Sequence, residues 1–273
     1  MKTQTEPSAR LSSATAPSGL VQQSDVHISF RNVSVSYGPV MALREVNLEV
    51  CRGEILGIIG PANSGKSTLL KCINRTIDFV PNARVTGQVL IDGQDVLKLR
   101  NVYALRRRIG MVFPLPVGLP LSVYENVAYA PRRAGVRQRH ELDAIVERCL
   151  RQAMLWDEVK ERLDILGTKL SGGQQQRLTL ARALSLDPEI LCLDEFSIAI
   201  DPVTTMRIED ILRELKQQVT IVLVTNLVQQ ARRLADRTAF FMAGRLVEVG
   251  STETIFEHPQ CELTRRYVVG DFG

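Results

Sequence analysis

The sequence has few of the residues from which disulfide frameworks and zinc sites are built. Its cysteines form no CxxC pair, are odd in number and stand at positions 51, 72, 149, 192 and 261. Its three histidines lie far apart in sequence, so a zinc site held by histidines is not indicated. Cys192 stands within an apolar run, as a buried free thiol does. This cysteine usage favours a reducing compartment.

Long apolar runs are also absent. The longest, such as Ile55–Ile59, fall far short of the about 20 residues that cross a bilayer as a helix. The first residues are polar and lack the apolar stretch of a secretory signal. We therefore expect a cytosolic protein, and we expect any membrane role to depend on a separate partner.

The charge balance is too even to indicate a nucleic acid partner, since the net charge is only +4. Two basic clusters occur, at 106–108 and 132–133. We interpret them as solvent-exposed faces, and the alternative is a docking surface for an acidic partner. Hydrophobic residues make up 45% of the 273 residues and charged residues 23%, as in an ordinary globular protein.

Local patterns divide the chain into a tail and one domain. Residues 1–25 are rich in Ser, Thr, Gln, Ala and Pro and predict a disordered tail. From residue 26 to 273, strands alternate with helices, which predicts a mostly parallel sheet covered on both faces. A helical insert is expected at about 114–186, with the apolar stripe of 140–153 facing the core. The predicted strands are Val26–Tyr37, Val46–Val50, Glu54–Ile59, Val85–Ile91, Ile109–Phe113, Ile190–Leu193 and Thr220–Thr225.

One glycine-rich stretch fits the pattern G-x-x-x-x-G-K-[ST] between an apolar strand and a helix. Backbone N–H groups of such a loop can cradle a polyphosphate, the lysine can reach the outer phosphates and the serine hydroxyl can bind Mg²⁺. The loop consists of Gly60, Pro61, Ala62, Asn63, Ser64, Gly65, Lys66, Ser67 and Thr68.

A second motif, ILCLDE at 190–195, is an apolar strand that ends in two acids. Asp194 can hold Mg²⁺, directly or through water. Glu195 can then act as general base on an attacking water.

A third motif, LSGGQQQR at 170–177, predicts a second anion site at a helix start. Ser171, Gly172 and Gly173 expose backbone donors there, and Gln174 follows them. A second phosphate-binding helix start in a chain with one phosphate loop calls for an explanation.

Together these motifs resemble those of ABC-type ATPases. The resemblance implies an α/β P-loop nucleotide-binding domain with a helical subdomain and an antiparallel β portion, which binds ATP and Mg²⁺. It also implies a head-to-tail dimer, in which residues 171–174 of one subunit close over the γ-phosphate held by the other. Tyr37 matches the position that stacks on adenine, and Asp201 matches the dimer-contact loop.

Further stretches resemble the ATPase subunit of the bacterial phosphate-specific importer, over roughly residues 26–273. The resemblance implies ATP-driven import of inorganic phosphate by a chain at the cytoplasmic face of the inner membrane. Its partners would be a second ABC subunit, identical or related, two membrane permease subunits and, indirectly, an extracytoplasmic phosphate-binding protein. The matching stretches are LLKCINRTIDFVPNARVTGQVLIDGQDV, LRRRIGMVF, LSVYENVAYA, LWDEVKERL, SGGQQQRLTLARAL and RRYVVGDFG.

The sequence departs from this family at three positions near the expected reaction. Pro114 stands where the family has a glutamine that approaches Mg²⁺ and the attacking water. Asn226 stands where the family has a histidine that contacts the γ-phosphate. An asparagine can cap the helix that begins at Leu227 and can donate to a phosphate oxygen, but it cannot titrate. Phe196 replaces a proline after Glu195, which we regard as a lesser change.

These departures leave alternatives open. We expect a protein that binds Mg-ATP and dimerises but hydrolyses slowly, or only with a partner. One alternative is a degenerate regulatory subunit that pairs with a more active relative. Another is a non-transport ABC ATPase acting on DNA or ribosomes, although the coiled-coil insertions or tandem domains usual in such proteins are missing.

Overall fold

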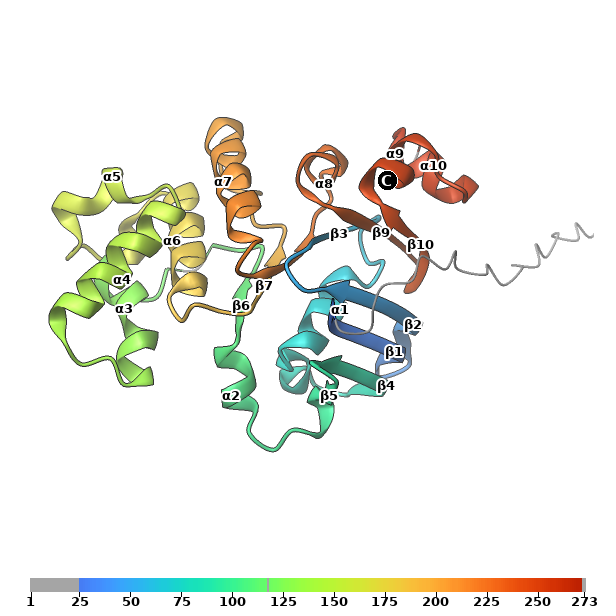
Figure 1. Ribbon diagram of the computed structural model, residues 1–273, viewed down its shortest axis with the longest axis horizontal. Coiled ribbons are helices and arrows are strands. Elements are labelled where there is room, and N and C mark those ends of the chain that lie inside the picture. The colour runs from blue at the N-terminus through green and yellow to red at the C-terminus, as the bar shows by residue number, and fades with distance from the viewer. Residues whose placement is uncertain (1–24, 117, 272–273) are drawn as a thin grey trace, which may run out of the picture.

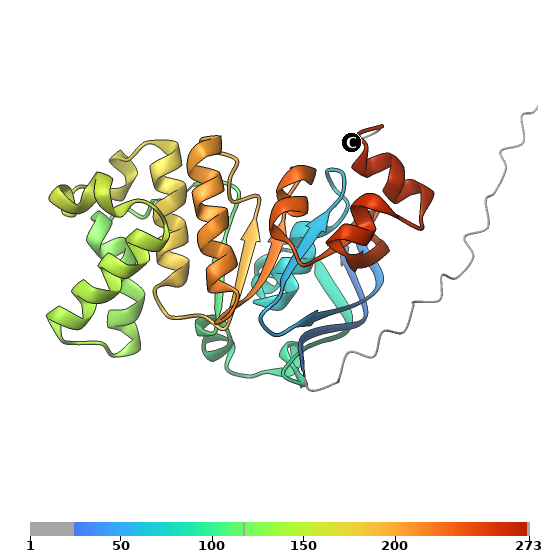
Figure 2. The ribbon, with the colours of Figure 1, turned by 45° about the horizontal axis from the view of Figure 1, so that its top comes forward.

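The computed structural model describes residues 25–116 and 118–271, which form two sheets with helices packed around them (Figure 1). Except for Asp25, the tail predicted at 1–25 lies outside these residues. In both ribbon views a group of helices lies at one end of the molecule, and the last two helices lie at the other (Figures 1 and 2).

The smaller sheet is antiparallel, with four strands in the order β2-β1-β4-β5. Alternating residues of its first strand, such as Val33 and Val35, are fully buried, as a sheet with one face on the core requires. The antiparallel β portion expected near the N-terminus is therefore confirmed. Its strands are β1 (Val26–Tyr37), β2 (Val40–Cys51), β4 (Ala83–Ile91) and β5 (Gln94–Asp95).

The larger sheet has six strands in the order β10-β9-β3-β8-β7-β6 and is parallel except for the hairpin of β9 and β10. Its strands are β3 (Ile55–Ile59), β6 (Ile109–Val112), β7 (Ile190–Asp194), β8 (Thr220–Val224), β9 (Arg237–Met242) and β10 (Arg245–Ser251). Every residue of β3, β7 and β8 is buried, which explains why these strands are continuous apolar runs.

Successive residues of β7 face two different cores. Leu191 and Leu193 belong to a core with apolar side chains of 123–184 and 208–212, whereas Ile190 and Cys192 pack against the antiparallel sheet and the helix after the phosphate loop. Full burial of such a side chain stabilises the fold by about 1.5–3 kcal/mol. Cys192 is a buried free thiol, as predicted.

Helices cover both faces of the larger sheet. The apolar stripe predicted at 140–153 is buried in α4, through Leu142, Val146, Cys149 and Leu150. The sequence did not predict α2, α9 or α10. The α-helices are α1 (Lys66–Ile73), α2 (Val102–Arg107), α3 (Val123–Ala134), α4 (Arg139–Gln152), α5 (Trp156–Val159), α6 (Gly172–Leu184), α7 (Pro202–Leu215), α8 (Val228–Leu234), α9 (Thr252–Glu257) and α10 (Glu262–Val268).

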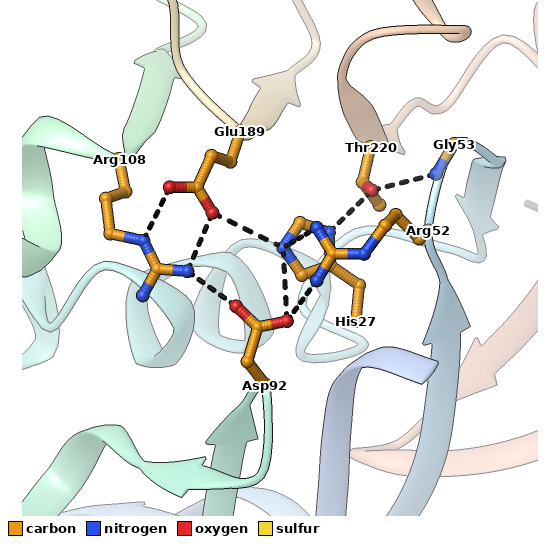
Figure 3. A network of polar contacts seen from close by, with 7 residues as sticks. All are labelled: His27, Arg52, Gly53, Asp92, Arg108, Glu189 and Thr220. Atoms are coloured by element: carbon orange, nitrogen blue, oxygen red, sulfur yellow. Dashed lines mark hydrogen bonds and ion pairs between the residues drawn. The ribbon is translucent and has the colours of Figure 1, made fainter. Parts of the chain in front are cut away.

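A polar cluster joins the two sheets at the amino ends of β7 and β8 (Figure 3). The buried His27 of β1 lies 2.6 Å, through Nδ1, from the Thr220 hydroxyl, which also accepts from the Gly53 N–H. On its other side, His27 Nε2 lies 3.9 Å from a carboxylate oxygen of Asp92 and of Glu189. The cluster therefore connects segments that are far apart in sequence.

Two arginines neutralise the carboxylates of this cluster. Arg108 donates to Glu189 at 2.7 and 2.9 Å and to Asp92 at 2.6 Å, and Arg52 donates to Asp92 (Figure 3). One histidine and two carboxylate ligand atoms lie within 4.8 Å of one another, a grouping that the spacing of the histidines did not indicate. The two guanidinium groups, however, already donate to the carboxylate oxygens that a metal cation would need.

Candidate active site

The phosphate loop is shaped by two glycines. After β3 the chain turns at Gly60, which has a φ of +148°, and it enters α1 through Gly65, which has a φ of +100°. A Cβ atom on Gly60 would lie 2.0 Å from the carbonyl oxygen of Phe241. Glycine at this position is therefore required both by backbone conformation and by space.

Lys66 is buried in the first turn of α1 and points into its own loop. Its Nζ donates to the carbonyl oxygens of Gly60 at 2.7 Å and Pro61 at 2.8 Å. Burial lowers the pKa of Lys66, while the carboxylates of Glu195 and Asp194 act in the opposite direction. An anion beside this ammonium would favour its charged form.

Ser67 and Asp194 lie in direct contact, although 127 positions separate them in sequence. The Ser67 hydroxyl donates to Oδ1 of Asp194 at 3.0 Å. Asp194 ends β7 and is buried, and burial raises the pKa of its carboxyl against the lowering effect of the Ser67 hydrogen bond. A hydroxyl and a carboxylate are hard oxygen ligands, and this pair fits a magnesium ion.

Glu195 takes a left-handed backbone conformation, with a φ of +48°, immediately after β7. Its N–H donates to the carbonyl oxygen of Val224 at 2.9 Å. Its Oε1 accepts a hydrogen bond from Nδ2 of Asn226, the second residue after β8. The carboxylate predicted to be the general base is therefore held by the asparagine that replaces the family's histidine.

The predicted helix cap at Asn226 is wrong. Helix α8 begins at Val228, and its N-cap position is Leu227, which makes no side-chain cap. The Leu227 N–H donates instead to the hydroxyl of Thr225 at 3.0 Å. The Asn226 side chain contacts Glu195 and caps no helix.

The LSGGQQQR motif begins α6 as predicted. Ser171 is the N-cap, and it forms a capping box with Gln174. Ser171 and Gly172 are exposed, as donors facing a second subunit need to be. A Cβ on Gly173 would lie 2.8 Å from the carbonyl oxygen of Ala199, so this helix start packs on the segment that follows Glu195.

The next two glutamines hold the loop that contains Pro114. Oε1 of Gln175 accepts from the Gly118 N–H at 3.2 Å, and Nε2 of Gln176 donates to the Phe113 carbonyl oxygen at 3.1 Å. Gln176 is 1% exposed, and its own Oε1 has no hydrogen-bond partner among the described residues. Hydrogen bonds therefore link α6 directly to the loop that contains Pro114.

The structure also places the other predicted site residues. The hydroxyl of Tyr37 lies 3.0 Å from that of Thr68, in the helix after the phosphate loop. Asp201 caps α7 by accepting from the Thr204 N–H at 2.9 Å. Phe196 is buried in the same core as Leu191 and Leu193. Adenine stacking by Tyr37 and a dimer contact at Asp201 stay predictions.

One site residue was missed from the sequence. Tyr267 of α10 stacks on Phe240 with ring centroids 4.9 Å apart, and a hydrogen bond joins its hydroxyl to the backbone of Gly60. The C-terminal helix thus contacts the first glycine of the phosphate loop. Nothing in the local sequence pattern signals a contact over this separation.

Comparison with known proteins identifies the family. A family model described as ABC transporter matches residues 43–197, more than half of the chain. This chain belongs to the ABC transporter family. The α/β P-loop fold expected from the motifs is confirmed. None of the helices in the described residues is long and apolar enough to cross a membrane.

Solved structures of ABC proteins are similar over most of the chain. The dimeric ATP-binding cassette MJ0796 in a post-hydrolysis state with ADP and Pi is 31% identical, with a TM-score of 0.72, over 82% of this chain and 98% of that one. Another dimeric structure of this bacterial ABC transporter cassette gives 31% identity over the same shares and a TM-score of 0.73.

A bacterial Atm1-family ABC exporter with ATP bound is 26% identical, with a TM-score of 0.79. That match covers 96% of this chain, which spans 44% of the exporter chain.

Proposed function

We propose that this chain is the ATP-hydrolysing subunit of an ABC importer for inorganic phosphate. The observation that carries ATP hydrolysis is the contact between Asn226 and Glu195, beside the pair of Ser67 and Asp194. Glu195 directly follows Asp194 in sequence, so the carboxylate held by Asn226 is next to the pair that we propose as the Mg²⁺ ligands. The choice of phosphate rests on the sequence stretches that resemble the phosphate-specific importer.

Each group has a defined task in this proposal. Backbone N–H groups of the phosphate loop and the Lys66 ammonium bind the phosphates of ATP. Ser67 and Asp194 would hold Mg²⁺, which neutralises phosphate charge when bound. Glu195 accepts the proton of the attacking water, and Asn226 fixes the direction of its carboxylate.

A second subunit completes the site. The exposed start of α6 supplies backbone donors to the γ-phosphate bound by its partner, and Tyr37 stacks on adenine. ATP binding closes the dimer, whether homomeric or heteromeric, and hydrolysis reopens it. Two permease subunits convert this cycle into alternating access, with the chain bound peripherally at the cytoplasmic face. An extracytoplasmic phosphate-binding protein delivers the solute.

ATP turnover by the purified protein with Mg²⁺ tests the hydrolysis step. We expect turnover that disappears in Glu195→Gln, while ATP binding persists in both proteins. Equal turnover in the two proteins would contradict the role of Glu195.

The solute is tested separately. Phosphate uptake is measured in cells that lack the ATPase of their phosphate importer and carry either this chain or its Glu195→Gln variant. Phosphate uptake that is restored by this chain but not by its Glu195→Gln variant supports phosphate as the transported solute. An active ATPase that restores no uptake with its own permease partners would overturn the choice of solute but not the hydrolysis.

Pro114 favours one second candidate, a regulatory subunit that binds ATP but hydrolyses poorly. No side-chain amide stands at that position to approach the water. This candidate predicts tight ATP binding with turnover no higher than in Glu195→Gln, until a more active relative is added.

A further inference from the structure

Gln230 of α8 is 1% exposed, and its amide contacts three different segments. Oε1 accepts from the Thr225 hydroxyl at 2.8 Å. Nε2 donates to Oγ of Ser197 at 3.1 Å and to Oε1 of Glu209 at 3.2 Å. The amide oxygen and both amide hydrogens therefore have partners inside the protein.

Two of these partners flank the reacting groups. Ser197 is the second residue after Glu195, and Thr225 immediately precedes Asn226. We propose that Gln230 is a positioning residue for ATP hydrolysis, because its one buried amide holds the segment of Glu195 against the segment of Asn226. This inference rests on the hydrolysis proposed above, and Gln230 itself touches no reacting atom.

The chemistry of the three partners requires an amide at this position. Thr225 donates, whereas Glu209 can only accept, so residue 230 must offer both an acceptor and a donor. Glu209 is itself buried and is held by Arg233 at 2.8 and 2.9 Å. A carboxylate at position 230 would meet that of Glu209, and an apolar side chain would leave buried polar groups unsatisfied.

Thr225 transmits this constraint to the backbone. Its hydroxyl donates to Gln230 and accepts from the Leu227 N–H at 3.0 Å. The turn at Asn226 is thus held on both sides. Strand β8 precedes it, and the Leu227 N–H that follows it is bonded to the Thr225 hydroxyl. If the Gln230 amide is removed, the hydroxyl loses its acceptor and the turn loosens.

The first test is Gln230→Met, with Gln229→Met as matched control because Gln229 is exposed on the same helix. We expect kcat for ATP to fall about tenfold in Gln230→Met, the equivalent of one to two hydrogen bonds. KM for ATP should stay within about twofold, because the phosphate loop is not touched. A kcat equal to that of the control would overturn the proposal.

A second pair of variants tests the same contact from the other side. Thr225→Val removes the hydroxyl at nearly constant volume, and Thr225→Ser retains it. We expect Thr225→Val to lose kcat as Gln230→Met does, the serine to recover most of that loss, and the double variant to lose no more than either alone. Additive losses would contradict a shared constraint. If Gln230→Met does not fold, the kcat values of the two Thr225 variants still test whether the Thr225–Gln230 hydrogen bond supports turnover.

Deuterium exchange keeps this test separate from turnover. Peptides covering 195–200 and 224–228 should exchange faster in Gln230→Met than in Gln229→Met, with peptides of α4 unchanged. If the wild type has no ATP turnover, the proposed hydrolysis is wrong. The exchange rates of these peptides then test by themselves whether Gln230 holds the two segments together. Equal exchange rates of these peptides in the two variants would contradict the positioning role of Gln230.

Discussion

The side-chain amide of Asn226 donates a hydrogen bond to the carboxylate of Glu195. Both residues follow neighbouring parallel strands, and the register pairs Asp194 with Val224. The parallel register of β7 and β8 therefore brings the two side chains together at the carboxyl edge of the sheet. An asparagine here can orient the carboxylate, but it offers no positive charge to a phosphate.

Restoring the two family residues should raise ATP turnover. Asn226→His combined with Pro114→Gln supplies a group that can carry charge and an amide near the attacking water. A donor to transition-state charge contributes on the order of 10²-fold in rate, so we expect a gain of about that size over the wild type. Steady-state kcat is the measurement. Wild-type turnover as fast as that of the double variant would show that Asn226 and Pro114 suffice.

Gly60→Ala should abolish ATP binding and destabilise the fold. The new methyl group would lie 2.0 Å from the Phe241 carbonyl oxygen, at a φ of +148° that only glycine tolerates. Gly250→Ala is the control, because a methyl group there meets its nearest atom at 3.7 Å. Calorimetric binding of ATP and thermal unfolding are compared for the two variants. Normal ATP binding by Gly60→Ala would contradict the described loop conformation.

His27 should make the stability depend on pH. Burial first, and then Arg52, lower the pKa of His27 below its ordinary 6.5. As the pH falls through 6.5, the unfolded chain binds a proton that the folded chain resists, so the free energy of unfolding decreases and levels off below the folded pKa. For one proton the slope is at most about 1.4 kcal/mol per pH unit.

Urea unfolding between about pH 8 and pH 5.5 covers the onset of this decrease, on both sides of the ordinary pKa of 6.5. Glu189 faces His27, and its pKa is lowered by Arg108, so its own contribution appears only in more acid solution. His27→Gln should remove the slope, and His140→Gln, at an exposed position, should retain it. Identical slopes in the two variants would assign the effect to other groups.

Tyr267→Phe should weaken ATP binding without unfolding the protein. The ring can still stack on Phe240, but the hydrogen bond to the Gly60 backbone is lost. One such bond corresponds to about a fivefold change in Kd, which calorimetry resolves. Tyr103→Phe, at an exposed position, provides the control. An unchanged Kd would mean that the phosphate loop keeps its shape without this hydroxyl.

Short-range patterns predicted much of the fold and the chemistry. The phosphate loop, the strand that ends in Asp194 and Glu195, and the helix after Ser171 were all recognisable, because each depends on neighbouring residues and on strand or helix periodicity. Parallel pairing then brings the ends of such strands to one edge. The contact of Ser67 with Asp194 follows from this geometry.

Contacts across long separations could not be predicted in the same way. Asn226 is a good helix cap by type, but α8 begins only at Val228, and the Asn226 side chain bonds instead to Glu195, 31 positions away in sequence. The stack of Tyr267 on Phe240 depends on where two short C-terminal helices fold back. His27 gives no sign in sequence of the four charged groups that surround it.

The two ends of the central strands in the larger sheet carry different groups. Asp194, Glu195 and Asn226 lie at or beyond the carboxyl ends of β7 and β8, whereas Thr220 and Glu189 lie at the opposite ends, within the His27 cluster. Damage to that cluster should loosen the whole molecule without altering the chemistry of any reacting group. A spectroscopic label attached beside the cluster would therefore report on the packing of the two sheets at a point away from the reacting groups.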